Sequence, residues 1–244
     1  MLTKSQIKLI SSLNQKKFRN QHQLFVVEGK KGIEEFLNSS FELHHLFSTS
    51  KDFKVSKTKF TLISENELKK ISNLKSPNKA LALFKIPSAK SIDNSQLIVA
   101  LDDVRDPGNL GTVIRLCDWF GVQHLVCSSA TVDCFNPKVV QATMGSLTRV
   151  SIHYLDLEEF LKTSTIPKFG AFMEGANIYT HILPTNGIIV MGNEANGISS
   201  NIEALIDKKI SIPRFGNLQS TESLNVATAT AILLSEFSRR TIEM

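Results

Sequence analysis

The sequence predicts an α/β protein in which a small α/β/α domain precedes a larger domain with a mostly parallel sheet covered on both faces. The first observation is that short apolar runs alternate with helical patterns from residue 97 to residue 240. The second is a polar segment at 87–96, PSAKSIDNSQ, whose composition is typical of a linker. We therefore predict one domain over residues 1–88 and a second over residues 97–244.

The first domain is expected to combine helices and strands. Apolar residues between Ile7 and Phe18 recur among lysines and glutamines, which predicts one helix with an exposed polar face over the first twenty residues. The apolar runs and helical patterns that follow predict strands at 24–29, 44–49, 59–64 and 80–86, and helices at 31–39 and 65–72.

The second domain is expected to begin with the apolar strand 97–103, LIVALDD. A helix over 109–121 follows and ends at Gly121, a residue type that often terminates helices. A strand at 124–129 precedes a helix at 136–147, and Pro137 suits the first turn of that helix. The alternation continues through 150–155, 158–163, 168–173 and 188–192, and ends with a strand at 208–213 and a helix at about 223–240.

Composition places the chain among globular proteins of the cytoplasm. Its 42% hydrophobic and 21% charged residues are ordinary for such proteins, and no apolar run is long enough to span a bilayer. The basic N-terminus lacks the apolar core and cleavage site of a signal peptide. Cys117, Cys127 and Cys134 match neither a disulfide framework nor a zinc spacing, so we expect reduced, buried thiols and no metal site.

Charge is distributed unevenly along the chain. Residues 1–90 contain 17 lysines and arginines against 7 acidic residues, whereas residues 91–244 contain 11 against 16. A basic first domain indicates contact with a polyanion, most plausibly a nucleic acid. The alternative is a solvated, lysine-rich surface without a partner.

Three loops rich in glycine and asparagine each follow an apolar, strand-like run. They are Asp106–Asn109, Gly192–Gly197 and the longer segment 213–225. In parallel α/β folds the carboxyl ends of strands are where ligands bind, so the three loops predict one pocket. The polar residues in these loops could instead have a purely structural role. Asn109 and Ser223 suit helix N-caps, and Glu194 could cap a helix near Ser199.

Arg115 interrupts an apolar stretch between Val113 and Cys117. A buried guanidinium needs an anionic partner, because an unpaired buried charge is costly. That partner is a phosphate of a ligand, or alternatively Asp118 or Glu194 within the chain. No G-x-G-x-x-G follows a strand, so a dinucleotide or classical Rossmann methyltransferase site is not supported, and no P-loop sequence is present.

The same segments resemble the three motifs of SpoU/TrmH-type RNA ribose 2′-O-methyltransferases, within the SPOUT superfamily. D-x-x-x-D-P-x-N-x-G-x-x-x-R matches 102–115, G-x-E-x-x-G matches 192–197, and I-P, Gly and S-L-N-V-A match 212–227. The conjunction is specific and covers about 150 residues. The pattern F-x-V-E-G-x-K-x-x-E-E at 25–35 is similar to the L30e-like substrate-binding domain of many members.

The resemblance implies a deep trefoil α/β knot, homodimers with the active site near the interface, and S-adenosylmethionine as the cofactor. Mapped by motif, the cofactor contacts are Met191, Gly192, Ile212, Leu224 and the loop 213–220. One departure is the segment NLQSTE at 217–222, which is longer than the usual family spacing and leaves the detailed cofactor contacts of this loop open.

The resemblance also implies methyl transfer to a ribose 2′-hydroxyl of structured RNA. The implied catalytic residues are Asn109, Arg115, Glu194, Ser223 and Asn225. Because an arginine is always protonated, we expect Arg115 to orient the hydroxyl and stabilise charge, with a phosphate oxygen or water accepting the proton.

Lys16, Lys17 and Arg19 are the candidate RNA contacts of the basic domain. By analogy, the L30e-like domain favours ribosomal RNA over tRNA as the substrate. Three alternatives remain: a tRNA 2′-O-methyltransferase, a non-catalytic RNA-binding protein that retains the fold, and methylation at a base atom.

Overall fold

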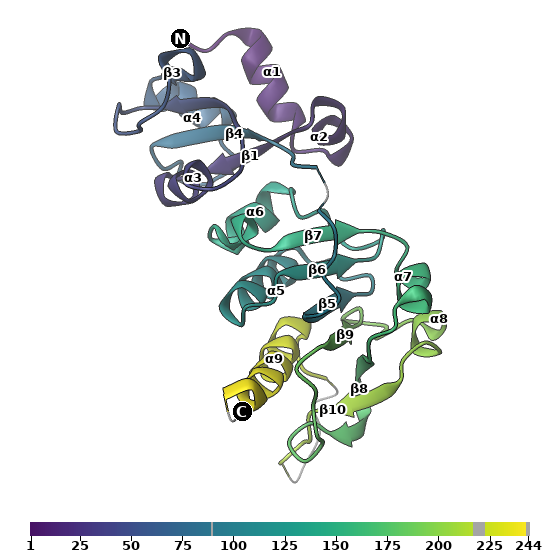
Figure 1. Cartoon of the computed structure of the whole chain (residues 1–244). Coiled ribbons are helices and arrows are strands. Elements are labelled where there is room, and N and C mark those ends of the chain that lie inside the picture. The colour runs from purple at the N-terminus through teal and green to yellow at the C-terminus, as the bar shows by residue number, and fades with distance from the viewer. Residues whose placement is uncertain (89, 217–222, 243–244) are drawn as a thin grey trace. The chain divides into compact units, whose positions relative to one another are not determined.

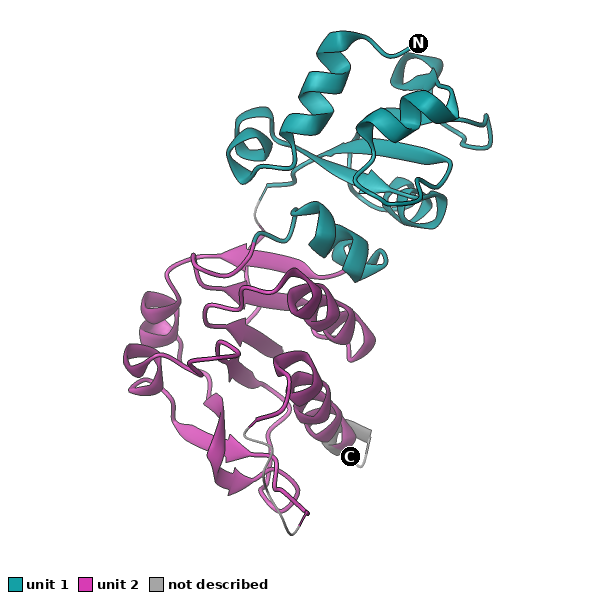
Figure 2. Cartoon of the chain, turned by 180° about the vertical axis from the view of Figure 1, so that it is seen from behind, with its two compact units in different colours: residues 1–88, 133–148 teal, residues 89–132, 149–244 magenta. Residues whose placement is uncertain are grey.

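The computed structural model describes residues 1–88, 90–216 and 223–242. The chain forms two compact units (Figure 2): residues 1–88 with 133–148, and residues 89–132 with 149–244. The division predicted from sequence did not foresee that segment 133–148 packs with the first unit. No helix within the described ranges is both long and apolar enough to cross a bilayer.

The first unit is a four-stranded sheet between helices. Its strands are β1 (Leu24–Glu28), β4 (Ala80–Lys85), β2 (Leu43–Ser48) and β3 (Phe60–Leu62), in the order β1-β4-β2-β3. Strand β4 is antiparallel to both of its neighbours, and β2 and β3 are parallel. The helices are α1 (Lys4–Ser12), α2 (Lys16–His22), α3 (Lys30–Leu37) and α4 (Glu65–Ile71), with a 3-10 turn η1 (Lys57–Lys59).

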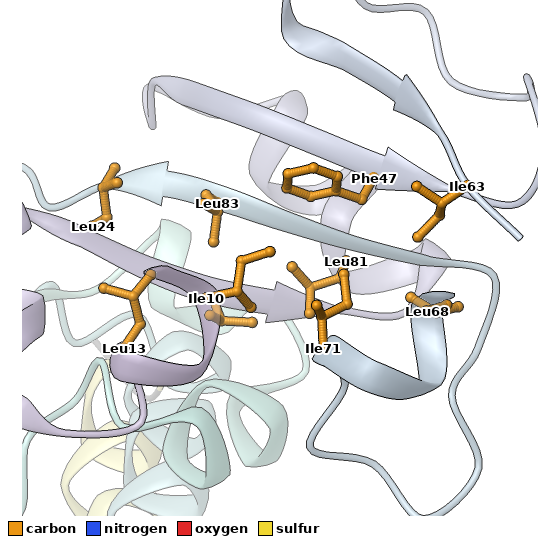
Figure 3. Packing of buried hydrophobic residues seen from close by; sticks show 10 residues of the cluster. Ile10, Leu13, Leu24, Phe47, Ile63, Leu68, Ile71, Leu81 and Leu83 are labelled. Atoms are coloured by element: carbon orange, nitrogen blue, oxygen red, sulfur yellow. The ribbon is translucent and has the colours of Figure 1, made fainter. Parts of the chain in front are cut away.

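The core of this unit follows from the alternation of side chains along its strands. Leu81 and Leu83 of β4 point to one face, where they pack with α1 and α4 (Figure 3). Phe84 lies on the opposite face, where its ring centroid is 5.2 Å from that of Phe36 in α3. The predicted α/β/α arrangement is therefore present.

The first twenty residues form two helices, not the single helix expected. Thr3 and Gln6 make a capping box that starts α1, and the break falls at residues 13–15. The Arg19 guanidinium donates a hydrogen bond from Nη1 to the Leu13 carbonyl oxygen at 2.8 Å. That carbonyl would accept an amide hydrogen bond from residue 17 if the helix continued, so the buried arginine stabilises the turn.

Segment 133–148 supplies α6 (Pro137–Thr143) and the 3-10 turn η2 (Ser146–Thr148) to the first unit. Asp133 forms a salt bridge with Arg19, whose guanidinium Nε and Nη2 lie 2.9 and 2.5 Å from one carboxylate oxygen. The ring centroid of Phe135 is 4.7 Å from that of Phe25. A charge pair and an aromatic contact thus hold this distant segment against β1 and α2.

The second unit has a six-stranded sheet in which every paired neighbour is parallel, as predicted. The strands, in spatial order, are β10 (Lys208–Ser211), β8 (Lys168–Asn177), β9 (Gly187–Met191), β5 (Leu97–Leu101), β6 (His124–Cys127) and β7 (Ser151–Tyr154). Helices α5 (Pro107–Trp119) and α9 (Val226–Ile242) cover one face, and α7 (Leu157–Thr163) and α8 (Ser200–Glu203) cover the other (Figure 1).

The strand order sets the position of the site. From β5 the chain moves outward through β6 and β7, whereas β9, β8 and β10 lie on the other side of β5. The loops after β5 and β9 therefore open at the point where the strand order reverses, which is where ligands bind in open parallel sheets. The implied knot stays a prediction, because the chain between β10 and α9 includes 217–222, outside the described residues.

Candidate active site

Three side chains from the three predicted loops form one hydrogen-bond relay. Asn225 Nδ2 donates to Asn109 Oδ1 at 2.9 Å, and Asn109 Nδ2 donates to Glu194 Oε1 at 2.8 Å. The orientation of the Asn225 side-chain amide is fixed, since its Oδ1 accepts the Ala227 backbone N–H at 2.9 Å. The amide group of Asn225 must therefore face Asn109, and that of Asn109 must face Glu194.

Helix starts hold two members of this relay in place. Asp106 caps α5 by accepting the Asn109 backbone N–H at 2.8 Å, and Pro107 occupies the first helical position. The Asn109 side chain is consequently not the cap and is available to the site. Asn225, not Ser223 as expected, caps α9 through its side-chain oxygen. Ser223 is exposed and lies on the wall of the pocket described below.

Glu194 is carried by a tightly folded loop between Gly192 and Gly197. Asn193 and Gly197 exchange two backbone hydrogen bonds of 2.9 Å, and Gly197 has a φ of +69°. A side chain at Gly192 would overlap with the backbone of Gly197, so only glycine permits this turn. The Asn193 side chain then donates to the Asp103 carbonyl at 2.7 Å, which joins this loop to the loop after β5.

Asp102 and Asn193 are positioning residues that the sequence interpretation did not assign. Asp102 is buried at the end of β5, and its carboxylate accepts both the backbone N–H and the hydroxyl of Ser199, at 2.8 and 2.7 Å. Two signals were present for Asp102: it directly follows an apolar strand, and it is the first residue of the motif matched at 102–115. The neighbouring Asp103 forms two 2.7 Å bonds to Arg105, which raise the pKa of that guanidinium.

A pocket of about 1080 Å³ lies beside the relay. Met191, Gly192, Ile212 and Leu224, the four residues predicted to contact a cofactor, all line it, and so does Glu194. Much of the remaining wall is apolar and comes from strands and from α9: Ala171, Phe172, Ile210, Val226 and Leu233. The contribution of β8 was not foreseen, because an apolar strand carries no signal of what it faces.

These walls fit S-adenosylmethionine. Apolar side chains suit an adenine ring, and the Gly192–Gly197 turn brings backbone within reach of polar groups on a ligand. The volume lies at the upper end of the range for small-molecule sites. The predicted contribution of residues 217–220 falls outside the described residues.

Arg115 is exposed, contrary to the expectation that it lies in a buried stretch. In α5 the buried residues recur at helical spacing, as Leu110, Val113, Ile114 and Cys117, and position 115 falls outside that stripe. Among the described residues Arg115 has no hydrogen bond or ion pair. Both suggested intrachain partners bind elsewhere: Asp118 pairs with Arg149, and Glu194 accepts from Asn109.

The predicted RNA contacts of the first unit differ in their exposure to solvent. Lys16 and Lys17 are exposed on α2. Arg19 is only 2% exposed and pairs with Asp133, so its assignment as an RNA contact was wrong. It is a structural arginine, because a charge at that depth requires a partner. The three cysteines are buried, as expected, and none of them forms a disulfide.

Comparison with known proteins agrees with this geometry. The model of the SpoU rRNA methylase family matches residues 96–235, and that of the MRM3-like substrate-binding domain matches residues 4–82. The chain is 27% identical over 231 residues, 91% of each sequence, to the 23S rRNA (guanosine(2553)-2′-O)-methyltransferase RlmP of Bacillus subtilis (strain 168).

Two solved structures share the whole fold. A TrmH-family protein from Porphyromonas gingivalis is 38% identical with a TM-score of 0.90, and the match covers 98% of this chain and 99% of that one. The AdoMet-bound rRNA methyltransferase from Sinorhizobium meliloti is 28% identical with a TM-score of 0.87, and the match covers 98% and 96%.

Proposed function

The chain belongs to the SpoU rRNA methylase family, and we propose that it transfers a methyl group from S-adenosylmethionine to a ribose 2′-hydroxyl of ribosomal RNA. The observation that carries the proposal is the relay from Asn225 through Asn109 to Glu194, at the edge of an apolar pocket. The relative from Bacillus subtilis is a 2′-O-methyltransferase of 23S rRNA, which supports the same reaction here.

The pocket is the proposed methyl-donor site. Met191, Ile212 and Leu224 provide apolar walls for the adenine ring and the aliphatic carbons of S-adenosylmethionine, and Gly192 allows the backbone to approach. When bound, this cofactor supplies a methyl group on a positively charged sulfur. The AdoMet-bound relative from Sinorhizobium meliloti supports this assignment.

The polar residues of the site are proposed to position the ribose 2′-hydroxyl. Methyl transfer needs the ribose oxygen in line with the methyl group, and holding reactants in such a geometry supplies much of the rate enhancement. Asn109 is fixed by Glu194 and Asn225, and Ser223 and Asn225 shape the ribose site. The Arg115 guanidinium stabilises negative charge, while a phosphate oxygen or water takes the proton of the hydroxyl.

The first unit is proposed to dock the RNA. The basic excess of residues 1–90 attracts phosphate, and Lys16 and Lys17 are exposed side chains that meet it. The match of residues 4–82 to a substrate-binding domain supports this division between docking and chemistry.

We further propose that the protein is a homodimer. Trp119 is 83% exposed on α5, and Arg115 lies one turn before it on the same helix. A tryptophan so exposed is typical of an interface residue. A second copy over this strip would place Arg115 at the interface, where it gains the anionic partner it lacks within the described chain.

The test is methyl transfer to unmethylated large-subunit ribosomal RNA with radiolabelled S-adenosylmethionine. Nuclease digestion and mass spectrometry should reveal a ribose-methylated nucleoside. Arg115→Ala should abolish transfer while calorimetry finds the cofactor affinity within about twofold of wild type.

Each other outcome counts against a named part of the proposal. A methylated base would contradict the 2′-hydroxyl as acceptor, and wild-type turnover by Arg115→Ala would remove the role of Arg115. Absence of cofactor binding at millimolar concentration would instead favour a non-catalytic RNA-binding protein.

A further inference from the structure

Exposed apolar side chains gather in the segments that border the methyl-donor pocket. Among the described residues, four of the large hydrophobic side chains that face solvent belong to these segments: Met173, Tyr179, Phe215 and Leu224. Met173 and Leu224 themselves line the pocket. Apolar surface grouped at the edge of a site, unlike scattered single residues, indicates contact with a binding partner.

Two of these residues form an aromatic pair. The ring centroids of Tyr179 and Phe215 lie 6.2 Å apart, with an angle of 38° between the ring planes. Tyr179 follows β8 and Phe215 follows β10, so neighbouring parallel strands bring the two rings together. Phe215 is 83% exposed and Tyr179 is 40% exposed, which leaves ring surface open to solvent.

The Phe215 ring does not belong to the described wall of the pocket. Its two chain neighbours, Arg214 and Gly216, line the pocket, whereas Phe215 is not part of the lining. The ring therefore lies next to the methyl-donor site and outside it.

If the chain methylates RNA as proposed above, we propose that Tyr179 and Phe215 form a stacking platform for an unpaired base next to the target nucleotide. Sequence-specific recognition of RNA relies on splayed bases that stack on aromatic rings. The platform would fix the target ribose against the methyl donor and restrict the reaction to unpaired RNA.

The experiment compares Phe215→Ala with Phe215→Trp, which retains a stacking ring. The probe is the same unmethylated large-subunit ribosomal RNA, and the readouts are its Kd, the KM and kcat of methyl transfer, and the Kd of S-adenosylmethionine. Loss of one stacked base should raise the RNA Kd and KM about tenfold in Phe215→Ala. Phe215→Trp should remain within about twofold of wild type, and the cofactor Kd should not change.

Ile182→Ala is the matched control, because Ile182 is 86% exposed in the segment that follows β8 but has no ring. The inference is overturned if Phe215→Ala binds RNA like wild type. It is also overturned if that variant loses affinity for S-adenosylmethionine, which would place the ring in the cofactor site, or if Ile182→Ala weakens RNA binding equally. A wild-type protein that binds RNA without methylating it would refute the proposed function, while the comparison of RNA affinities would still decide the role of Phe215.

Discussion

At the scale of single residues, Asn109 determines the geometry of the site because it joins the other two members of the relay. Its amide nitrogen donates to Glu194 and its amide oxygen accepts from Asn225. An asparagine is the side chain that offers a donor and an acceptor in this fork.

Asn109→Asp should therefore lower kcat by about 100-fold, since a second carboxylate would face Glu194 and displace the loop it is meant to hold. The cofactor Kd should change little, because Asn109 is not part of the pocket wall. Steady-state kinetics and calorimetry test this together. Asn109→Asp with normal kcat would show that the relay has no role in the reaction.

The buried ion pair Arg19–Asp133 leads to a prediction about stability. Asp133→Ala should lower the free energy of unfolding of the first unit by about 3–5 kcal/mol, because it leaves the guanidinium buried without its partner. Urea unfolding measures the change. Arg19→Met combined with Asp133→Leu should recover most of the loss.

The control for this pair is the exposed ion pair Glu158–Lys162. Lys162→Ala should leave the urea midpoint unchanged, since water screens such pairs. An equal loss in both single variants would contradict a special role for burial.

At the scale of elements, the turn Gly192–Gly197 determines whether the pocket exists. Gly192→Ala forces the added methyl group against the Gly197 backbone, so the turn must open. We expect the Kd of S-adenosylmethionine to rise at least about tenfold. Gly216→Ala is the matched control, because it also lines the pocket but a methyl group there meets no atom within 4 Å. Equal cofactor affinity in the two variants would exclude steric closure of the turn.

Strands β6 and β7 are joined by a buried histidine pair whose protonation should make stability depend on pH. The Asp93 backbone N–H donates to His124 Nε2, so His124 Nδ1 carries the proton that faces His153 Nε2 at 3.1 Å. Burial is the main cause that lowers the pKa of both imidazoles. Burial therefore disfavours the protonated form of both rings, and an added proton would break the pair.

A lowered pKa in the folded state means that the unfolded chain binds protons first as the pH falls. Stability should be constant above the ordinary histidine pKa of about 6.5 and decline below it, by at most about 1.4 kcal/mol per pH unit for each histidine. Urea midpoints at pH 7.5, 6.5 and 5.5 test this. His153→Leu should flatten the decline, and a wild-type slope in that variant would rule out the pair as its source.

At the scale of the whole molecule, the proposed dimer predicts that Trp119 is a contact between subunits. Trp119→Asp should convert the dimer to a monomer and reduce methyl transfer, because an aromatic anchor carries much of the energy of an interface. Sedimentation velocity measures the mass, and far-UV circular dichroism checks the fold. A monomeric wild-type protein with full activity would overturn the proposal.

The sequence by itself determined the fold class, nearly every element of the parallel sheet and the three loops of the site. These features depend on local patterns: the period of apolar residues, and glycine, proline and asparagine where the backbone turns. The loop 106–109, for instance, predicted a helix starting at residue 109, and α5 begins close by, at Pro107.

The tertiary structure alone decided which side chains are paired and which are free. Arg19 lies in a basic, polar stretch and Arg115 lies among apolar neighbours, yet the first is buried against Asp133 and the second faces solvent. The partner of Arg19 lies 114 positions away in sequence, and no local pattern contains that distance. Burial depends on what other elements cover a residue, and that is fixed only when distant segments such as 133–148 pack together.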